Sequence, residues 1–460
     1  MAVRQEGQTT MPPPPSSVST LEALAVYLKP RVLTVMFLGF SGGLPFALTL
    51  STMQAWLTQS GIDVKEIGLF AAIGIPYVVK FLWAPFVDAL EVPILSRLLG
   101  RRRSWLLVSQ FGLMAAIVLM AFSSPVLSLI AFALAALLVA TASATQDIVI
   151  DAFRVESLPE NEQAAGMASY VAAYRVGALV SGAGTLYLVT GIEKLGLPTQ
   201  AAWSASYVVM ALLVCVGIGA TLFATEPAKS RAVAAEHSAH AAEGALRRVL
   251  ATTISAFMDF FSRDLVVAVL AFVVLFKLAD ALATALSTKF ILDLGFSRDE
   301  LATINKGVGF IATLTGGFAG GFVARALPLG RSLIIGGILQ TVTILAFSLQ
   351  AIVGRDLLML TFSISIEAFT AAIGTVIFVA YLSALCQSPL HTATQFALLT
   401  ALAALGRTVF AAGAGYIEAA VGWPMYFVIC ALTAIPSFVL LFMLIRLGHF
   451  ATLGTRPAWL

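Results

Sequence analysis

The stretch SATQDIVIDAFR (143–154) continues a long apolar run, LIAFALAALLVATA (129–142), that is fit for a lipid bilayer. It brings three ionisable side chains, Asp147, Asp151 and Arg154, to the end of that run. An ionised side chain at the bilayer centre costs about 2.5–3.5 kcal/mol on insertion scales. Either the membrane helix ends before these residues and they lie in water, or they are buried in protein, where charged groups mark a pathway.

The composition indicates an integral membrane protein. Of the 460 residues, 59% are hydrophobic and 11% are charged, and the mean hydropathy is +0.95. Soluble domains carry roughly 25% charged residues, and a membrane span needs about 20 mostly apolar ones. The sequence predicts twelve spans, at 32–53, 67–90, 104–122, 126–148, 166–190, 203–224, 264–287, 302–324, 332–353, 357–380, 394–416 and 423–446. Their length and their Gly and Ala content predict an all-α membrane protein rather than a β-barrel.

The distribution of positive charge predicts how the spans are oriented. Of the 27 lysines and arginines, seventeen lie in the termini and the even-numbered loops, five inside spans and five in the remaining loops. The positive-inside rule then places both termini in the cytoplasm. The Pro- and Ser-rich start of the chain has no apolar core, so we expect a disordered cytoplasmic tail over 1–30 rather than a signal peptide, and a second tail over 447–460. The net charge of +3 gives no case for nucleic-acid binding.

The spans fall into two groups of six, in residues 31–224 and 264–446, joined by the longest connection, 225–263. Within this connection several apolar residues fall on one helical face, as expected for an amphipathic helix on the cytoplasmic membrane surface; a plain linker is the alternative. The apolar residues are Leu246, Val249, Leu250, Phe257, Met258 and Phe261.

The two groups resemble each other. GFSGGLP (39–45) and FKLADAL (276–282) open them at an offset of 237 residues. In span five Gln163 precedes Arg175 by twelve residues, and in span eleven the same spacing recurs between glutamine and arginine at 395 and 407. A parallel repeat of six-helix halves is the plan of the major facilitators, whose substrate site lies between the halves near the membrane midplane.

A basic turn recurs at the same place in each half. After span two Asp88 precedes GRRRS (100–104), and after span eight comes GGFVARALPLGRS (320–332). An aspartate with an arginine cluster fits the signature of that superfamily, although Asp88 is distant in sequence and the second half has Ala324 and Arg325 where an acid is expected. The residues to which we assign gating are Asp88, Arg101, Arg102, Arg103, Arg154, Arg325 and Arg331.

Charged residues inside spans usually face a bundle interior or a water-filled cavity. Helical spacing puts Lys277 and Asp280 on one face, either as an ion pair that holds a helix or as a working site. Asp147 and Arg154 either lock helix ends together or contact substrate. Glu367 has no residue near it in sequence that can pair with it, which favours a role in loading and releasing a proton.

The sequence shows no signature of an enzyme. The four histidines, His237, His240, His391 and His449, lie outside the predicted spans, and no cysteine or carboxylate set completes a metal site. The sequence has no GxxxxGK[ST] loop, which disfavours transport driven by ATP within this chain.

Motifs along nearly the whole chain give it a family resemblance. They are GFSGGLPFALT (39–49), QAW (54–56), KFLWAPFVD (80–88), GRRRSWLL (100–107), SATQDIVIDAF (143–153), YRVGALVSG (174–182), FKLADALATALSTKFI (276–291), INKGVGFIATLTGG (304–317), GGILQ (336–340), TATQFALLTALAALGR (392–407) and GW (422–423). With these the sequence resembles the AmpG-type muropeptide permeases, a bacterial branch of the major facilitator superfamily. One departure is Ala279, where the family pattern has glycine; Lys277 and Asp280 on either side are kept.

The resemblance implies a multi-pass permease of the bacterial inner membrane that works in cell-wall recycling. The cargo of the family is N-acetylglucosaminyl-1,6-anhydro-N-acetylmuramyl peptide, taken up from the periplasm and driven by the proton motive force without a cofactor. Where a β-lactamase is inducible, the imported fragments feed its induction. By analogy with the superfamily we expect a monomer in membrane lipid.

Cations, amides and aromatic rings suit this cargo, because arginine binds carboxylates bidentately and aromatic faces suit sugar rings. The substrate-binding candidates are Gln54, Tyr77, Lys80, Trp83, Gln146, Arg175, Lys277, Asn305, Lys306, Gln395 and Arg407. The proton-coupling candidates are Asp147, Asp151, Asp280 and Glu367.

Other functions remain open from the sequence. A major facilitator carrier for another bulky or anionic molecule, such as an acyl-coenzyme, a siderophore or a drug, would have the same fold. A membrane receptor or scaffold that transports nothing is the second alternative; it would need no charges in a cavity.

Overall fold

The computed structural model describes residues 25–228, 230, 245–411 and 413–453, and this part of the chain folds into helices without strands. The first half consists of η1 (Val26–Leu28), α2 (Pro30–Leu48), α3 (Ser51–Gln59), α4 (Val64–Leu69), η2 (Phe70–Gly74), α5 (Ile75–Val79), η3 (Lys80–Leu82), α6 (Ala84–Ala89), α7 (Leu95–Leu99), α8 (Arg101–Ala121), α9 (Leu129–Ser157), α10 (Glu160–Leu179), η4 (Val180–Gly184), α11 (Thr185–Lys194), α12 (Thr199–Leu213) and α13 (Cys215–Phe223). The connecting helix is α15 (Ala245–Phe261). The second half consists of α16 (Val266–Phe276), α17 (Leu278–Ala285), α18 (Ser287–Asp293), α19 (Arg298–Ile304), η5 (Asn305–Gly309), α20 (Phe310–Ala326), α21 (Leu329–Val353), α22 (Leu357–Leu385), α23 (Thr392–Ala411), α24 (Ala414–Leu432), α25 (Ile435–Arg446) and α26 (His449–Thr452).

The predicted spans correspond to apolar helices. Among the described residues, ten helices or helix runs are long and apolar enough to cross a membrane. Two shorter apolar helices, Ala72–Leu82 and Thr392–Ala404, occupy the places of predicted spans two and eleven. The predicted tails lie largely outside the described residues. Val26–Leu28 forms a short helix within the tail that we expected to be disordered, and His449–Thr452 forms one within the second tail.

Span two is broken rather than continuous. Its residues are divided among α4, η2, α5, η3 and α6, and proline occupies the first turn of both α5 and α6, at Pro76 and Pro85. Proline lacks the N–H that would continue the helical hydrogen bonds. Lys80 therefore lies at a helix junction, the end of α5 and the start of η3.

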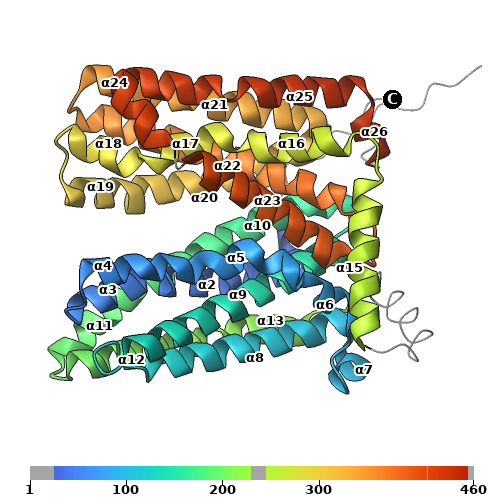
Figure 1. The fold of residues 1–460 in the computed structure, drawn as a ribbon, viewed down its shortest axis with the longest axis horizontal. Coiled ribbons are helices and arrows are strands. Elements are labelled where there is room, and N and C mark those ends of the chain that lie inside the picture. The colour runs from blue at the N-terminus through green and yellow to red at the C-terminus, as the bar shows by residue number, and fades with distance from the viewer. Residues whose placement is uncertain (1–24, 229, 231–244, 412, 454–460) are drawn as a thin grey trace, which may run out of the picture.

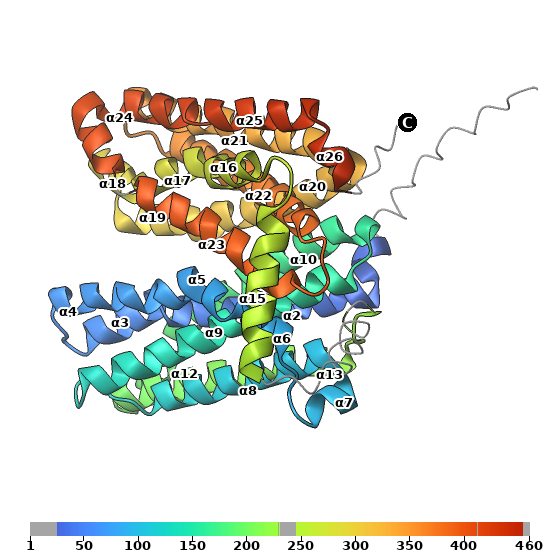
Figure 2. The ribbon, with the colours of Figure 1, turned by 45° about the vertical axis from the view of Figure 1, so that its right-hand side comes forward.

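The two halves lie side by side with their long helices roughly parallel, and α15 crosses the ends of these helices (Figure 1). We call this end of the molecule the α15 end. Turning the molecule shows α15 running from the first half to the second (Figure 2). Across the halves, α10 packs against α20, and α23 packs against α6 and α9. Among the described elements, α3, α4 and α11 form no comparable interface with α18, α19 and α24 at the opposite end.

Glycines let helices approach closely within a half. A Cβ on Gly39 of α2 would lie 3.0 Å from the Cα of Tyr170 on α10, and one on Gly320 of α20 would lie 2.9 Å from the Cα of Ile373 on α22. Side chains at these positions would force the helices apart, as in the small-residue contacts common between membrane helices. The halves are therefore tightly packed units between which a site can form.

Candidate functional site

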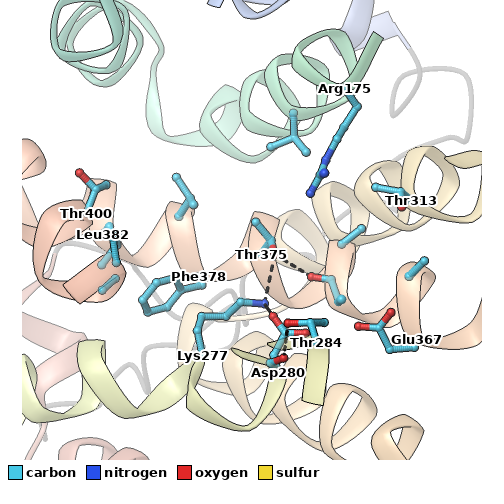
Figure 3. Close-up of a pocket in the computed structure, with 17 residues that line it drawn as sticks. Arg175, Lys277, Asp280, Thr284, Thr313, Glu367, Thr375, Phe378, Leu382 and Thr400 are labelled. Atoms are coloured by element: carbon cyan, nitrogen blue, oxygen red, sulfur yellow. Dashed lines mark hydrogen bonds and ion pairs between the residues drawn. The ribbon is translucent and has the colours of Figure 1, made fainter. Parts of the chain in front are cut away.

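A cavity of about 470 Å³ lies between the halves. Helix α10 contributes its lining from the first half, and α17, α20, α22, α23 and the α16–α17 junction contribute from the second (Figure 3). The lining residues are Val171, Arg175, Lys277, Asp280, Thr284, Thr313, Glu367, Ala368, Ala371, Ala372, Thr375, Phe378, Val379, Leu382, Thr400, Ala403 and Ala404. Four of the predicted site residues, Arg175, Lys277, Asp280 and Glu367, thus meet in one cavity.

Lys277 and Asp280 form an ion pair at a break in span seven. Lys277 separates α16 from α17, and its Nζ lies 3.0 Å from Asp280 Oδ2 and 3.2 Å from Thr375 Oγ1. Asp280 is in the first turn of α17, where the helix dipole favours a negative charge. Broken helices of this kind form the substrate and ion sites of many transporters.

Glu367 faces the same cavity from α22, although the sequence offered it no partner (Figure 3). Its carboxyl group interacts electrostatically with Asp280 and Lys277. Thr375 lies eight residues further along α22 and also lines the cavity. Thr375 is not among the predicted site residues, although the spacing of Glu367, Ala371 and Thr375 by four residues marks one helical face.

Arg175 reaches into the cavity from the first half, pointing from α10 toward the charged residues of the second half (Figure 3). No ion pair of Arg175 is present among the described residues, and the charge of its guanidinium acts on Glu367. A cation in a cavity without a bound partner is suited to an anionic ligand.

A second charged cluster lies inside the first half. Lys80 Nζ is 3.5 Å from Asp147 Oδ2 and 4.0 Å from Asp151 Oδ2. Arg154 Nη2 lies 3.7 Å from Asp151 Oδ1. All four residues are wholly or largely buried, and their two positive and two negative charges balance.

Arg154 also joins the halves at the α15 end. Its Nη1 donates a hydrogen bond of 3.1 Å to Ser383 Oγ on α22, and its guanidinium lies 5.2 Å from the ring centre of Phe396 on α23. This buried arginine thus connects the acidic pair of the first half to two helices of the second.

Four other substrate candidates lie apart from the described lining of the cavity. Gln54, on α3, is exposed, and Tyr77, on α5, packs against the first-half core. Trp83 Nε1 donates to Thr145 Oγ1 at 3.1 Å. Gln146 is buried, and its amide donates to Ser41 Oγ at 3.0 Å.

The basic turn of the first half forms a buried network, so the distance of Asp88 from its arginines in sequence was no obstacle. Arg102 Nη2 lies 2.8 Å from Asp88 Oδ1 and 2.5 Å from Glu156 Oε1. Arg101 Nη1 donates to the Asp88 carbonyl at 2.7 Å. The backbone N–H groups of Arg102 and Arg103 donate to Glu226 at 2.9 and 3.1 Å.

Neither glutamate of this network is among the predicted gating residues. Glu156 follows Arg154 by two residues at the end of span four, and Glu226 follows span six. A carboxylate directly after a span, on the same side of the membrane as an arginine cluster, is the signal that would have identified them.

Asp88 also bridges the two halves. Its carboxylate accepts hydrogen bonds from the backbone N–H groups of Ala393 (3.3 Å) and Thr394 (2.8 Å) and from Thr394 Oγ1 (2.8 Å). These groups belong to the first turn of α23, whose N–H groups and dipole favour an anion. A side chain of the first half therefore caps a helix of the second.

The second basic turn is arranged differently. Arg325 and Arg331 are exposed, and Arg325 lies close enough to Tyr27 of the first half to act on its hydroxyl. Asn305 and Lys306 belong to the π-helical segment η5, and Arg407 belongs to α23, but the side chains of these three candidates lie outside the described part of the structure.

Gln395 is not in the described lining of the cavity. It lies at the α15 end, where it binds α15. Its amide donates to Asp259 Oδ2 of α15 at 2.7 Å. Asp259 also pairs with Arg263 at 2.7 Å, and Arg263 Nη1 donates to the Leu385 carbonyl at 2.5 Å. Partial burial raises the pKa of Asp259, but the hydrogen bonds from Arg263 and Gln395 bring it below its ordinary value.

Comparison with known proteins places this fold and cavity in a family. A family model described as the Major Facilitator Superfamily matches residues 35–387. The anhydromuropeptide permease of Escherichia coli (strain K12) is 38% identical over 419 residues, which cover 91% of this chain and 80% of the relative. A transporter of Rickettsia conorii named AmpG 4 is 33% identical over 90% of this chain and 96% of its own.

A solved structure of the proton:xylose symporter XylE has the same fold, with a TM-score of 0.67 over 92% of this chain and 96% of that one, at 12% identity. The relatives are permeases and transporters rather than enzymes. The chain is a multi-pass membrane transporter that belongs to the major facilitator superfamily and, within it, to the family of AmpG-type anhydromuropeptide permeases.

Proposed function

We propose that this protein imports N-acetylglucosaminyl-1,6-anhydro-N-acetylmuramyl peptides from the periplasm to the cytoplasm in peptidoglycan recycling. It lies in the inner membrane as a monomer, with the α15 end and both termini in the cytoplasm, and uses the proton motive force in place of a cofactor. The observation that carries the proposal is the 38% identity to the E. coli anhydromuropeptide permease over 91% of the chain.

The chemistry of the cavity supports an anionic, hydroxyl-rich cargo. The cargo carries two sugar rings and the carboxylates of its peptide. Arg175 presents a guanidinium from the first half, and the threonines at 284, 313 and 400 present hydroxyl groups from the second. A cargo that contacts both halves couples its own binding to the closing of the halves.

A count of charges ranks the proton-coupling candidates. In the first half Lys80 and Arg154 already balance two aspartates. Among the described residues of the second half, Lys277 is the cation that faces Asp280 and Glu367, and Arg175 of the first half supplies a second positive charge. When a cargo carboxylate pairs with Arg175, Lys277 can balance only one of the two charges on Asp280 and Glu367. An uncompensated negative charge in a buried site is costly. A proton on Glu367 restores the balance, so cargo and proton bind together.

Uptake of labelled anhydro-disaccharide tripeptide into proteoliposomes tests this function. An inward proton gradient should drive accumulation, and a protonophore should abolish it. Failure of demonstrably folded protein to take up this cargo would point to a carrier for another anion. Uptake that ignores the gradient would remove proton coupling but keep the cargo.

The variant Glu367→Gln tests the role of the carboxyl group. We expect it to bind cargo and exchange it across the membrane but to lose accumulation driven by the gradient, because the glutamine cannot give up a proton. Asp293→Asn is the matched control, since Asp293 is a half-exposed carboxylate outside the described lining of the cavity. Gradient-driven accumulation by Glu367→Gln at the level of the control would contradict the assignment.

A further inference from the structure

Helix α15 has an apolar face that the rest of the described protein does not cover. Val249, Ala256 and Phe260 are buried against the bundle. On the other side of the helix, Leu250 is 54% exposed, Ile254 is 58% exposed and Met258 is 66% exposed. These exposed residues recur every four positions, so they form a stripe along the helix.

The apolar residues of this segment that were predicted to share one helical face are divided between two faces in the structure. Val249 packs inward, whereas Leu250, Met258 and Phe261 belong to the exposed side. The exposed stripe, which we define as Leu250, Ile254, Met258 and Phe261, is therefore not a part of the docking surface of α15 on the bundle.

The position of α15 indicates what covers this stripe. The helix lies across the ends of the membrane spans and so runs along the membrane surface (Figures 1 and 2). It packs against α6, whose Phe86 is exposed as expected for a lipid-facing residue of a span. At its other end the chain turns directly into α16, whose exposed Val267 is in the first turn of span seven. Helix α15 therefore joins two segments that carry exposed apolar side chains, as lipid-facing spans do.

Charge points to the kind of lipid. Arg247 and Arg248 stand in the first turn of α15, and Arg247 is exposed. Cations beside an apolar stripe on a helix in the interface are attracted to anionic headgroups.

We propose that α15 is an anionic-lipid sensor: its stripe enters the boundary between headgroups and acyl chains of the cytoplasmic leaflet, with Arg247 and Arg248 on anionic headgroups. Asp259, bonded to Gln395, and Ser255, whose hydroxyl lies 3.2 Å from His391 Nε2, tie α15 to the start of α23, which Asp88 caps from the first half. Lipid held by α15 therefore stabilises the closed α15 end. The inference rests on the proposed orientation of this end and not on the proposed cargo.

Spin-label accessibility in nanodiscs tests the position of the stripe without any cargo, so its outcome is independent of the transport assay. Cys215, Cys386 and Cys430 are first replaced by alanine, and Ile254→Cys then carries the label. Val267→Cys serves as the lipid reference and Gln387→Cys, in the exposed α22–α23 loop, as the water reference.

We expect the label at 254 to collide with oxygen like the label at 267, and to be shielded from a water-soluble nickel chelate. Phosphatidylglycerol should increase its depth relative to phosphatidylethanolamine alone, and Arg247→Gln with Arg248→Gln should remove that increase. Accessibility to nickel as at 387 would place the stripe in water and overturn the proposal. Shielding from both reagents would indicate a protein partner and overturn it as well.

Discussion

Arg175 is a guanidinium in a cavity whose other charged residues come from the opposite half. A guanidinium binds a carboxylate through two parallel hydrogen bonds, whereas an ammonium acts as a point charge. We expect Arg175→Lys to raise the KM for anhydro-disaccharide tripeptide about tenfold, which corresponds to the loss of about 1.5 kcal/mol from one charged hydrogen bond. Initial uptake rates over a range of cargo concentrations measure this change.

Arg355→Lys is the matched control for this substitution, because Arg355 is an exposed residue that pairs with Glu300 away from the cavity. Its KM should equal that of the unsubstituted protein. A KM for Arg175→Lys within twofold of the control would mean that Arg175 does not hold the anionic group of the cargo.

The carboxylate of Asp88 pairs with the buried Arg102 and also accepts hydrogen bonds from the N-terminus of α23. The loss of its charge should therefore weaken the contact between the halves. An asparagine must turn an amide NH2 either toward Arg102 or toward the N–H groups of α23, and both are donors. Removing one partner of a buried pair costs about 3–5 kcal/mol. We expect Asp88→Asn to reduce the population that is closed at the α15 end by at least tenfold.

Pulsed electron paramagnetic resonance measures that population from the distance between two spin labels. The labels replace Arg97 of α7 and Arg331 of α21, which are both exposed. The distance distribution should shift to longer values in Asp88→Asn and stay unchanged in Asp293→Asn. Identical distributions in both variants would show that the capping contact does not hold the end closed.

At the scale of residues, the sequence indicates which side chains are chemically unusual better than it indicates which side chains lie next to each other in space. The sequence singled out Lys277, Asp280 and Glu367 because an ionisable group in an apolar run is costly unless it has a function, and the structure brings the three to one cavity. The place of Gln395 was not found, because its partner Asp259 is 136 residues away and lies on a loop helix. Helical spacing reveals neighbours within one element and says nothing about contacts between elements.

At the scale of elements, α15 is held to the α22–α23 loop by a contact that depends on pH. Burial lowers the pKa of His391, although the negative charges of Asp88 and Asp259 oppose this and Arg263 reinforces it. Because the pKa of His391 is lowered while α15 is docked, the imidazole binds a proton more readily when α15 is undocked. The docking of α15 is therefore fully stable above the ordinary value of 6.5 and weakens as the pH falls below it.

The mobility of a spin label on the exposed Ala251 of α15 should accordingly increase as the pH is lowered from 7.5 to 5.5. This range extends about one pH unit to each side of the ordinary histidine pKa. His391→Gln keeps a hydrogen-bonding group for Ser255 but cannot be charged, so its response should be flat. Asp259, with its pKa held low, stays ionised throughout this window. An equal response in both proteins would assign the change to another group.

Helix boundaries were predicted less well than helix existence. Hydropathy located every apolar segment, because burial in lipid demands a helix of sufficient length. It did not locate the breaks at Lys80 and Lys277, where local geometry departs from a continuous helix. Pro76 and Pro85 on either side of Lys80 were the available signal for the first break. The second break follows no proline, and only the ionisable pair marks it.

At the scale of the whole molecule, internal similarity predicted two halves with a site between them, and the cavity lined from both halves agrees with that plan. The sequence could not tell which end is closed, since a transporter visits more than one arrangement with the same residues. In this structure the contacts across the halves gather at the α15 end, through Asp88, Arg154 and the packing of α10 on α20.

The packing of α10 on α20 is close at Gly321 on α20. A Cβ there would lie 2.8 Å from the Cβ of Ala168 and 3.2 Å from the carbonyl of Ala164 on α10, and 3.1 Å from the Tyr27 hydroxyl. Gly321→Ala should therefore wedge the halves apart, and overpacking of this kind costs about 1–3 kcal/mol. The labels on Arg97 and Arg331 should report more of the open form, and uptake should slow because the cycle needs both forms.

Gly317, one turn earlier on the same helix, provides the control, because a Cβ built there meets no described atom within 4 Å. Gly317→Ala should leave the label distances and the uptake rate unchanged, while both substitutions remove the same backbone freedom from α20. If both variants move the labels equally, the cause is the stiffness of the helix and not the contact between the halves. A shift confined to Gly321→Ala identifies the α10–α20 contact as the surface on which the two halves close.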